Sequence, residues 1–318
     1  MTANFQRGIA IVSIDTELMW GYRDTLSEAQ FQTQYPDSPS AHAKLLSRLA
    51  AARVSATWFV VGALTQREGV PGHGGKGRLW EAAAFVQCLR DVSPTQEIAV
   101  HGGLTHQLWT HATMTREIAE QELKGGIDAL ATVCPQPCSF SFPRNCEAFY
   151  DLLPRHGIHA YRGRPPALSW RLGRTLPGAI LRALDEVRRA TPPAVMPYQE
   201  IPGLWNIPAS MFLYPIGPAR TRIVGLRSRV ERFRRGIEAA ARQRAIFHFC
   251  LHPENLAESP HGVFLLDDIL DVLVRARRRG DIEILTMRDV LNRLQGEESY
   301  VCQEQYQYTD VLETHRRG

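Results

Sequence analysis

The chain has 318 residues, 44% of them hydrophobic, which is enough to form a sizeable buried core. Its formal net charge of +4 comes almost wholly from arginine, because only Lys44, Lys76 and Lys124 are lysines. The arginines at 227–244 and 275–279 have helical spacing, which is typical of a solvated helix face and argues against nucleic-acid binding. No run of about 18 apolar residues occurs, so a transmembrane helix is not expected.

Two features of the sequence bear on the cellular compartment. Residues 1–8 contain no basic segment followed by an apolar run, so nothing resembles a secretory signal. The six cysteines lack the paired C-x-x-C spacing of a zinc ribbon or redox motif, and we expect free thiols at Cys88, Cys134, Cys138, Cys146, Cys250 and Cys302. We therefore expect a cytoplasmic protein. The sequence does not indicate an oligomeric state.

Short β-branched runs alternate with longer segments of helical period, a pattern that predicts βα units around a mainly parallel sheet. In chain order we expect a strand at 9–15, a helix at 40–53, strands at 56–61 and 97–101, a helix at 115–133, a strand at 138–142, a helix at 148–156, a strand at 158–161, a helical stretch at 181–189, a strand at 204–213, a helix at 227–242, a strand at 245–251, a helix at 264–279, a strand at 282–285 and a helix at 287–294.

No internal repeat and no convincing linker divides the chain, so we expect one catalytic domain over residues 1–295. Residues 163–202 are the least periodic part, and we interpret them as an excursion that covers one end of the sheet. Residues 296–318 form a polar tail.

In α/β proteins of this kind, reactive side chains lie where strands run into the following loops. The segment I-V-S-I-D-T-E at 11–17 ends a predicted strand with Asp15 and Glu17. One carboxylate there would ligate a metal and the other would take a proton from water. Taken alone, the same segment fits an aspartate at a helix N-cap beside a solvated glutamate equally well.

The segment E-I-A-V-H-G-G-L-T-H at 97–106 delivers His101 at the end of a strand, and a Gly-Gly turn returns His106 to the same neighbourhood. Two histidines and one carboxylate make an open catalytic zinc site that leaves a position for water. His111 is a spare histidine nearby. A pair of histidines is by itself more often structural.

Two later segments complete the set. In S-F-S-F-P-R-N at 139–145, Arg144 follows a strand and suits holding a carboxylate bidentately, whereas Asn145 also fits an N-cap. In I-F-H-F-C-L-H-P-E-N at 246–255, His252 ends a late strand and would protonate a leaving amine. His248 in the same strand also fits a core histidine.

Together these four segments resemble the polysaccharide deacetylase family, of the carbohydrate esterase or chitooligosaccharide deacetylase type. The motifs of that family are a T-F-D-D strand end, H-S/T-x-x-H, an arginine-proline segment and a late Leu-His. The segments S-I-D-T-E-L-M-W-G, A-T-W-F-V-V-G, F-P-R-N and H-P-E-N-L are similar to a branch whose first motif is Asp-x-Glu. The resemblance covers about residues 8–295. It implies an α/β fold, a distorted (β/α) barrel of about seven or eight units.

The resemblance also implies the roles of individual residues. Asp15 would be the general base, His252 the general acid, and Arg144 the group that positions Asp15. A divalent metal, Zn²⁺ or another, would be bound by Glu17, His101 and His106. Substrate contacts are expected from Trp20, Trp109, Asn145 and Asn255.

Two departures from the family pattern concern the metal ligands. Thr16 stands where the second aspartate of the standard motif would be, so Glu17 has to be the carboxylate ligand. The two histidines are five residues apart instead of four, which requires an extra residue in the turn. Gly102 and Gly103 make that turn feasible.

The sequence therefore predicts a metal-dependent hydrolase that removes an N-acyl group, acetyl or formyl, from an amino sugar or another N-acylated small molecule. An antibiotic intermediate or a lipid-linked sugar is among the expected substrates. Two other hypotheses remain open: a catalytically inactive sugar-binding relative, and a metal-independent C–N hydrolase that acts on a non-sugar amide or ureide.

Overall fold

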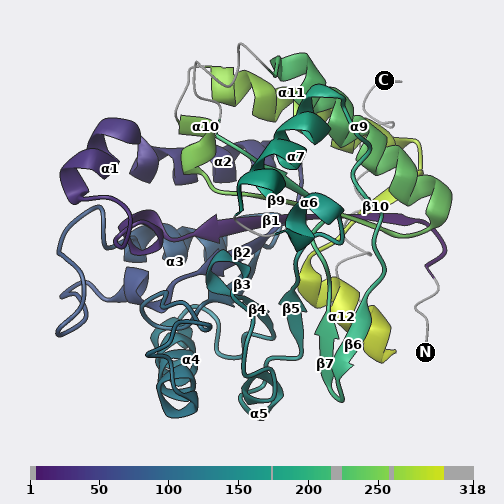
Figure 1. Cartoon of the computed structure of the whole chain (residues 1–318). Helices are drawn as coiled ribbons and strands as arrows, with labels where there is room; N and C mark the ends of the chain where they lie inside the picture. Colours follow the sequence, from purple (N-terminus) through teal and green to yellow (C-terminus); the bar gives the residue numbers. More distant parts are fainter. Residues whose placement is uncertain (1–4, 173–174, 216–223, 258–260, 297–318) are drawn as a thin grey trace, which may run out of the picture.

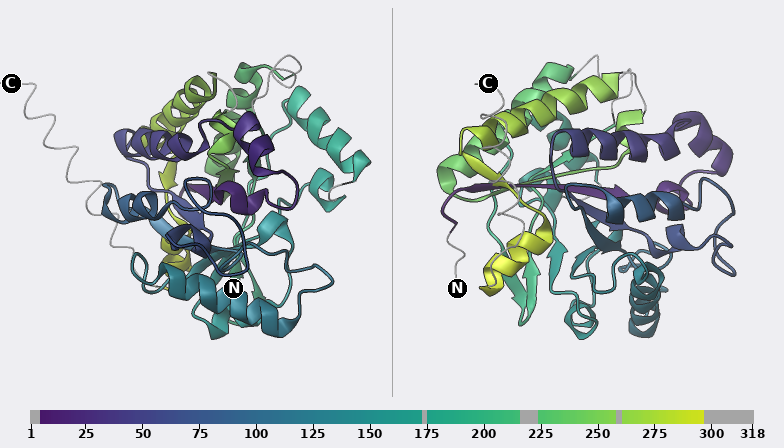
Figure 2. Two further views of the ribbon diagram at one scale, coloured as in Figure 1. Left: turned by 90° about the vertical axis from the view of Figure 1, so that its left-hand side faces the viewer. Right: turned by 180° about the vertical axis from the view of Figure 1, so that it is seen from behind.

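The computed structural model of the protein describes residues 5–172, 175–215, 224–257 and 261–296 (Figure 1). The predicted polar tail at 296–318 lies outside these residues apart from Gly296. Within them, the chain forms one curled sheet of ten strands with helices packed around it (Figures 1 and 2).

The sheet is almost entirely parallel. Its order is β6-β7-β5-β4-β3-β2-β1-β9-β8, with β10 beside the first residues of β1, and among these pairs only β6 with β7 is antiparallel. The strands are β1 (Gly8–Thr16), β2 (Thr57–Val60), β3 (Glu97–His101), β4 (Ser139–Ser141), β5 (Ala160–Arg162), β6 (Tyr198–Ile201), β7 (Leu204–Asn206), β8 (Met211–Leu213), β9 (Ile246–Leu251) and β10 (Ile282–Ile284). The predicted sheet is confirmed.

A single stretch of chain closes the barrel, because only residues 207–210 separate β7 from β8. β7 pairs with β5 and is one strand in from the β6 edge of the sheet, and β8 pairs with β9 at the other edge. Between them, the N–H of Ile207 donates to the carbonyl of Tyr161 at 2.9 Å, and the N–H of Ser210 donates to the carbonyl of His248 at 2.7 Å. The predicted strand at 204–213 is thus two short strands at opposite ends of the strand order, and the predicted distorted barrel is confirmed.

Helices cover the outside of the sheet, with α9 against both β1 and α11 (Figure 1). They are α1 (Glu28–Gln34), α2 (Ser38–Ala51), α3 (Ala83–Asp91), α4 (Arg116–Leu130), α5 (Leu152–Arg155), α6 (Leu168–Arg171), α7 (Leu176–Val187), α9 (Leu226–Gln243), α10 (Glu254–Ala257), α11 (His261–Arg278) and α12 (Met287–Gln295), with 3-10 helices η1 (Leu18–Gly21), η2 (Gly62–Thr65) and η3 (Pro143–Asn145). Among the described helices, none is both long and apolar enough to cross a bilayer.

The two faces of β1 explain where the core ends and the site begins. Ala10, Val12 and Ile14 pack under the outer helices. The alternate positions face the barrel interior, where Ile9 and Ile11 join a second apolar cluster that includes Met287, Val290 and Leu291 of α12. Because side chains alternate along a strand, Ser13 and Asp15 continue the interior face towards the carboxyl end. The interior is therefore apolar at one end and polar at the other.

Candidate metal centre

Several strands change from apolar to polar side chains along their inward-facing positions. On β3, Ala99 belongs to the interior cluster and His101 is the next residue on that face. On β5, Ala160 belongs to the same cluster and Arg162 follows it. The carboxyl ends of these parallel strands meet at one end of the barrel, which is where α/β barrels place their reactive groups.

Glu17 lies directly after β1 and before η1, and its side chain is buried. Its carboxylate folds back over Gly21. A Cβ at position 21 would lie within 2.2–2.6 Å of the three carboxyl atoms of Glu17. Only glycine leaves room for this conformation, so the final glycine of the segment D-T-E-L-M-W-G fixes the position of the carboxylate.

The turn between the two histidines contains the extra residue that the sequence requires. Gly102 and Gly103 have φ values of 68° and 106°, in the left-handed region that favours glycine. The buried Glu122 of α4 holds the turn, because its carboxylate accepts from both the N–H and the hydroxyl of Thr105 at 2.7 Å. The turn thereby directs His106 towards His101.

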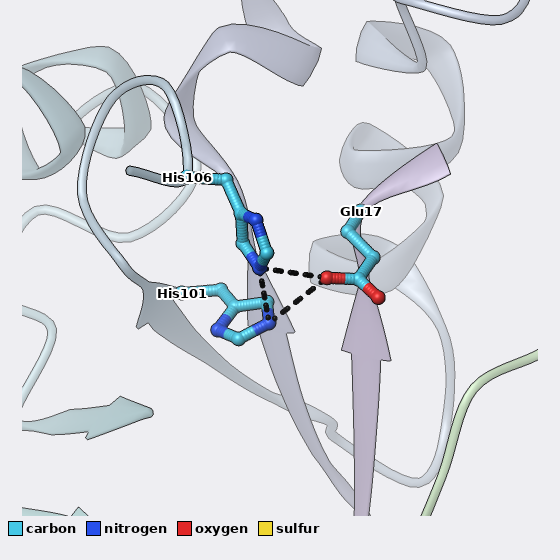
Figure 3. A group of neighbouring side chains, drawn as sticks. All are labelled: Glu17, His101 and His106. Atoms are coloured by element: carbon cyan, nitrogen blue, oxygen red, sulfur yellow. Dashed lines mark hydrogen bonds and ion pairs between the residues drawn. The ribbon is translucent and has the colours of Figure 1, made fainter. Parts of the chain in front are cut away.

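Glu17, His101 and His106 meet at a single point (Figure 3). One carboxylate oxygen of Glu17, Oε2, lies 2.8 Å from Nε2 of His106 and 3.3 Å from Nε2 of His101. The two Nε2 atoms are 3.2 Å apart. A tetrahedral zinc ion with ligands at about 2.0–2.2 Å separates its ligand atoms by roughly 3.3–3.6 Å. The three side chains therefore have nearly the spacing that such an ion requires.

The protonation states of the three side chains also fit a cation. Nδ1 of His101 lies 3.0 Å from the carbonyl of Ser141, which only accepts, so Nδ1 carries a hydrogen and Nε2 of neutral His101 is a bare lone pair. Burial lowers the pKa of His106 in spite of the adjacent Glu17, and this favours its neutral form. Burial opposes ionisation of Glu17, but His252 and His106 outweigh it and hold the pKa of Glu17 well below its usual range.

Asp15 is held by Arg162 and not by the predicted Arg144. The guanidinium of Arg162 donates to both carboxylate oxygens of Asp15 at 2.7 Å, and both side chains are buried. Arg162 also donates to the hydroxyls of Ser13 at 3.2 Å and Ser141 at 2.8 Å. Burial alone would raise the pKa of Asp15, but Arg162 together with the nearby histidines lowers it well below its usual range. Asp15 is therefore an oriented, ionised carboxylate.

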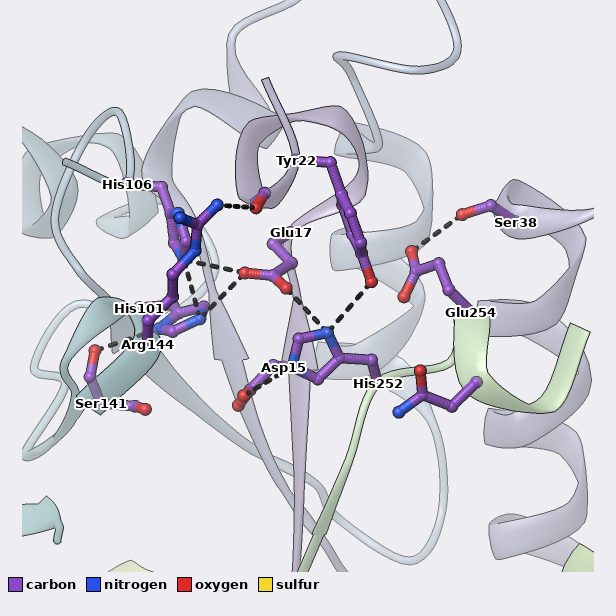
Figure 4. Close-up of polar contacts among 12 residues, drawn as sticks. Asp15, Glu17, Tyr22, Ser38, His101, His106, Ser141, Arg144, His252 and Glu254 are labelled. Atoms are coloured by element: carbon purple, nitrogen blue, oxygen red, sulfur yellow. Dashed lines mark hydrogen bonds and ion pairs between the residues drawn. The ribbon is translucent and has the colours of Figure 1, made fainter. Parts of the chain in front are cut away.

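The prediction for Arg144 is corrected for a geometric reason. The backbone of Arg144 has a left-handed φ of 52° inside η3. The guanidinium of Arg144 donates to the carboxylate of Asp24 and to the carbonyl of Gly21. Arg144 therefore binds the segment after Glu17 instead of Asp15 (Figure 4). Arg162, the last residue of β5, was not selected from the sequence, although it follows the core residue Ala160 on the same face of the strand.

His252 stands between the two carboxylates (Figure 4). Nδ1 lies 2.8 Å from Oε1 of Glu17, and Nε2 lies 3.2 Å from Oδ2 of Asp15. Tyr22 adds its hydroxyl at 3.3 Å from Nδ1. Burial acts against the charged ring, but Glu17 and Asp15 raise the pKa of His252 well above its usual range. The structure thus brings the predicted acid and base together.

Three of the four predicted substrate contacts are corrected by burial. Trp20 and Trp109 are each 1% exposed, and their ring N–H groups donate to the carbonyls of Trp80 and Gly102 at 3.0 Å. Asn255 is also buried and donates to the carbonyl of Leu213 at 2.6 Å. Asn145 is half-buried in η3, and its contact with substrate stays a prediction.

Comparisons with known proteins identify the fold. Neither a family model nor a curated protein matches the sequence. A solved structure assigned as a polysaccharide deacetylase, from Mycobacterium smegmatis, matches with a TM-score of 0.63 and 16% sequence identity over 93% of this chain and 94% of the other. The chain therefore has the fold of the polysaccharide deacetylases, as the sequence motifs predicted.

Two carbohydrate-active enzymes share the fold as well. A 4-α-glucanotransferase from Thermococcus litoralis matches with a TM-score of 0.57 and 14% identity over 90% of this chain and 40% of the other. A GH57-type branching enzyme from Pyrococcus horikoshii matches with a TM-score of 0.55 and 12% identity over 92% and 71%. At this level of identity the likeness concerns the fold alone, so the chemistry has to be argued from the site.

Replacing Gly126 of α4 by alanine is expected to disturb the metal centre through the backbone. The added Cβ would lie 2.5 Å from the carbonyl carbon of Gly103, so the turn that carries His106 has to move. We expect Gly126→Ala to cost about 1–3 kcal/mol in the free energy of unfolding and to weaken metal binding roughly tenfold or more. Metal titration and chemical denaturation measure both effects.

The matched control is Gly125→Ala, at the next position of α4. Its Cβ would approach Cβ and Cδ2 of Leu104 at 3.2 Å, a milder contact than the 2.5 Å approach to the backbone of Gly103, and it gains the same helix propensity. The interpretation is wrong if the two variants bind metal equally well.

The imidazole ring of His248 is expected to stay neutral well below pH 6.5 in the folded protein. Burial, followed by the charge of Arg162, lowers its pKa from 6.5 to about 3. A group whose pKa is lower in the folded protein binds a proton more readily when the chain unfolds. As the pH falls below 6.5, His248 therefore lowers the free energy of unfolding, by roughly 2 kcal/mol at pH 5. His248→Gln removes this contribution, so the variant should lose less stability than the wild type between pH 7 and 5.

The measurements are the free energy of unfolding of both proteins at each pH and an NMR titration of the His248 ring. A His248 ring that protonates near pH 6.5 in the folded protein would contradict the prediction.

Proposed function

We propose that this protein is a metal-dependent amide hydrolase that removes an N-acetyl or N-formyl group from an amino sugar or a similar N-acylated small molecule. The observation that carries the proposal is the meeting of a carboxylate and two histidine nitrogens within 3.3 Å of one another, beside the pair of Asp15 and His252. Amide hydrolysis requires an activated carbonyl, a base for water and an acid for the amine. The site has a group for each of these tasks.

Glu17, His101 and His106 would hold the divalent metal, which we expect to be Zn²⁺. When bound, it would act as a Lewis acid on the acyl carbonyl and on water. Ser141 contributes from outside the ligand set, because its carbonyl fixes the Nδ1 hydrogen of His101 and leaves Nε2 free to ligate. Two neutral imidazoles and one carboxylate keep the ligand set open, as a catalytic site needs.

Asp15 would take the proton from the attacking water. Arg162 keeps this carboxylate ionised and fixes both of its oxygens, so its orientation does not depend on the substrate. His252 would give a proton to the departing amine, because Glu17 and Asp15 favour its charged form. After the reaction the proton taken by Asp15 has a short path back to His252, since Nε2 of His252 is 3.2 Å from Oδ2 of Asp15.

The ionisation of the two carboxylates favours amide hydrolysis over cleavage of a glycosidic bond. Glycosidases of the usual kind need one carboxyl group that keeps its proton and gives it to the leaving oxygen. Here Asp15 and Glu17 both have a pKa below the usual range. Burial raises both pKa values, but Arg162 beside Asp15 and His252 beside Glu17 lower them by more. This direction of the two pKa values supports an amide substrate, although the fold is shared with the glucanotransferase and the branching enzyme.

The metal assignment predicts a difference between two neighbouring histidines. Purified wild type is expected to bind about one equivalent of zinc. His106→Ala should lose it and release no amine from a panel of N-acetyl and N-formyl amino sugars. The control is His111→Ala, which removes an exposed histidine five residues further along and should keep both metal and activity. Metal analysis and an amine assay measure the two effects.

Other results would support different hypotheses. Amine release by a metal-free wild type would leave hydrolysis in place but reassign the two histidines and Glu17, as in a metal-independent hydrolase of amides or ureides. Bound sugar without any amine release, together with the fold, would favour an inactive sugar-binding relative.

Because Arg162 and not Arg144 holds Asp15, substitutions of the two arginines are expected to change the pH dependence of kcat differently. Arg162 lowers the pKa of Asp15, so Arg162→Gln raises it, and Asp15 becomes protonated at higher pH. The acid limb of the kcat profile should move upward by roughly 1–3 pH units. Arg144→Gln should leave that limb in place. An equal shift in both variants, with folding checked by circular dichroism, would refute the assignment of Arg162.

A further inference from the structure

Helix α7 presents its apolar side to solvent. Its exposed positions follow the 3.6-residue period along one side of the helix, and all of them are apolar: Leu176, Pro177, Ala179, Ile180, Ala183, Leu184 and Val187. Leu176 is 74% exposed and Ile180 is 51% exposed. A surface helix of a water-soluble domain normally turns this side towards the core. The orientation of α7 is therefore inverted.

The polar side of α7 faces the protein. Glu186 is buried, and the carboxylate of Asp185 accepts from the hydroxyl of Ser169 in α6 at 3.0 Å. Arg182 donates to the carbonyl of Ser169 at 2.6 Å and lies over the ring of Trp170. These contacts fix the rotation of α7 about its own axis, so the exposed apolar side follows from the packing of α6 against α7.

Helix α6 extends the same surface. Leu168 is 64% exposed and Leu172, directly after the helix, is 39% exposed. With the exposed residues of α7, they form what we call the α6–α7 surface. Monomeric soluble proteins rarely leave several large apolar side chains of neighbouring helices in water, so this surface is expected to have a partner.

The exposed charged residues among the described part of 168–190 are all arginines. Arg171 at the end of α6, and Arg188 and Arg189 after α7, are exposed. The acidic residues between 168 and 190 are only Asp185 and Glu186, and both belong to the inward side. Apolar side chains flanked by arginines are the pattern of helices that lie in the interface of an anionic membrane.

The position of the α6–α7 surface relates it to the metal centre. Five residues separate α6 from Arg162, whose guanidinium holds Asp15 at the carboxyl end of the barrel. The hairpin therefore leaves the barrel from the same end that carries the metal centre. In Figure 2, left, the teal helices of this segment lie at the side of the barrel.

We propose that the α6–α7 surface docks onto the surface of a bilayer that contains anionic lipid. The apolar side chains enter the boundary between headgroups and acyl chains, and the arginines contact lipid phosphates. A second copy of the chain fits less well, because a symmetric contact places the same patch on both subunits and sets arginine against arginine. If the proposed hydrolase function holds, docking would favour a lipid-linked N-acyl sugar as the substrate.

The test is flotation of the full-length protein with vesicles of phosphatidylcholine that contain about a third phosphatidylglycerol. We expect binding that weakens severalfold on pure phosphatidylcholine and in high salt. Leu176→Glu with Ile180→Glu should lower binding at least tenfold. Arg171→Gln with Arg188→Gln should lower it severalfold and remove most of its salt dependence. All four positions are exposed, so folding is expected to be retained.

The control is Phe264→Glu, which places one glutamate on an exposed apolar residue of α11 and should bind as the wild type does. Failure of the wild type to float, or equal flotation of Leu176→Glu with Ile180→Glu, overturns the proposal. The proposal is also overturned if light scattering shows that the wild type is a dimer and that Leu176→Glu with Ile180→Glu is a monomer. The α6–α7 surface would then be the contact between two copies of the chain. Vesicle binding does not require hydrolysis, so a failure of the proposed function would appear separately, in the amine assay.

Discussion

The bidentate contact between Arg162 and Asp15 organises the polar end of the barrel. It joins β5 to β1 across the interior, above an apolar layer that excludes water from below. A buried pair of this kind is stable only when its remaining hydrogen-bonding groups are satisfied, and here the hydroxyls of Ser13 and Ser141 accept from the guanidinium. The orientation of Asp15, and through it the position of His252, depends on this contact.

Around this contact the site alternates carboxylates and imidazole rings. His252 lies between the carboxylates of Asp15 and Glu17, and Glu17 in turn faces His101 and His106. Each carboxylate is ionised because its cationic or imidazole neighbours outweigh the effect of burial. Such a site tolerates little rearrangement, since removal of one member leaves a buried charge without its partner.

The sequence was sufficient for the fold class and for the three side chains that meet in the candidate metal centre, because both depend on local patterns. Parallel strands were indicated by alternating apolar runs, and Glu17, His101 and His106 by polar residues at strand ends. Arg162 was missed because family motifs directed attention to Arg144, while the true signal was the inward register of Ala160 and Arg162. Trp20 and Trp109 were misassigned because burial of a tryptophan depends on tertiary neighbours that a sequence does not place.

The pairing of β1 has a consequence for synthesis on the ribosome. This strand is completed early, but it lies in the sheet between β2 and two strands from the far end of the chain, β9 and β10. One of its edges therefore has no partner until Leu251 has emerged, and its first residues wait for Ile284. Contacts of such long sequence separation form slowly and leave a hydrophobic strand available for wrong pairing. The nascent chain therefore exposes this strand until the later strands have been synthesised, and the surroundings of Asp15 are completed only when the segment after β9 delivers His252.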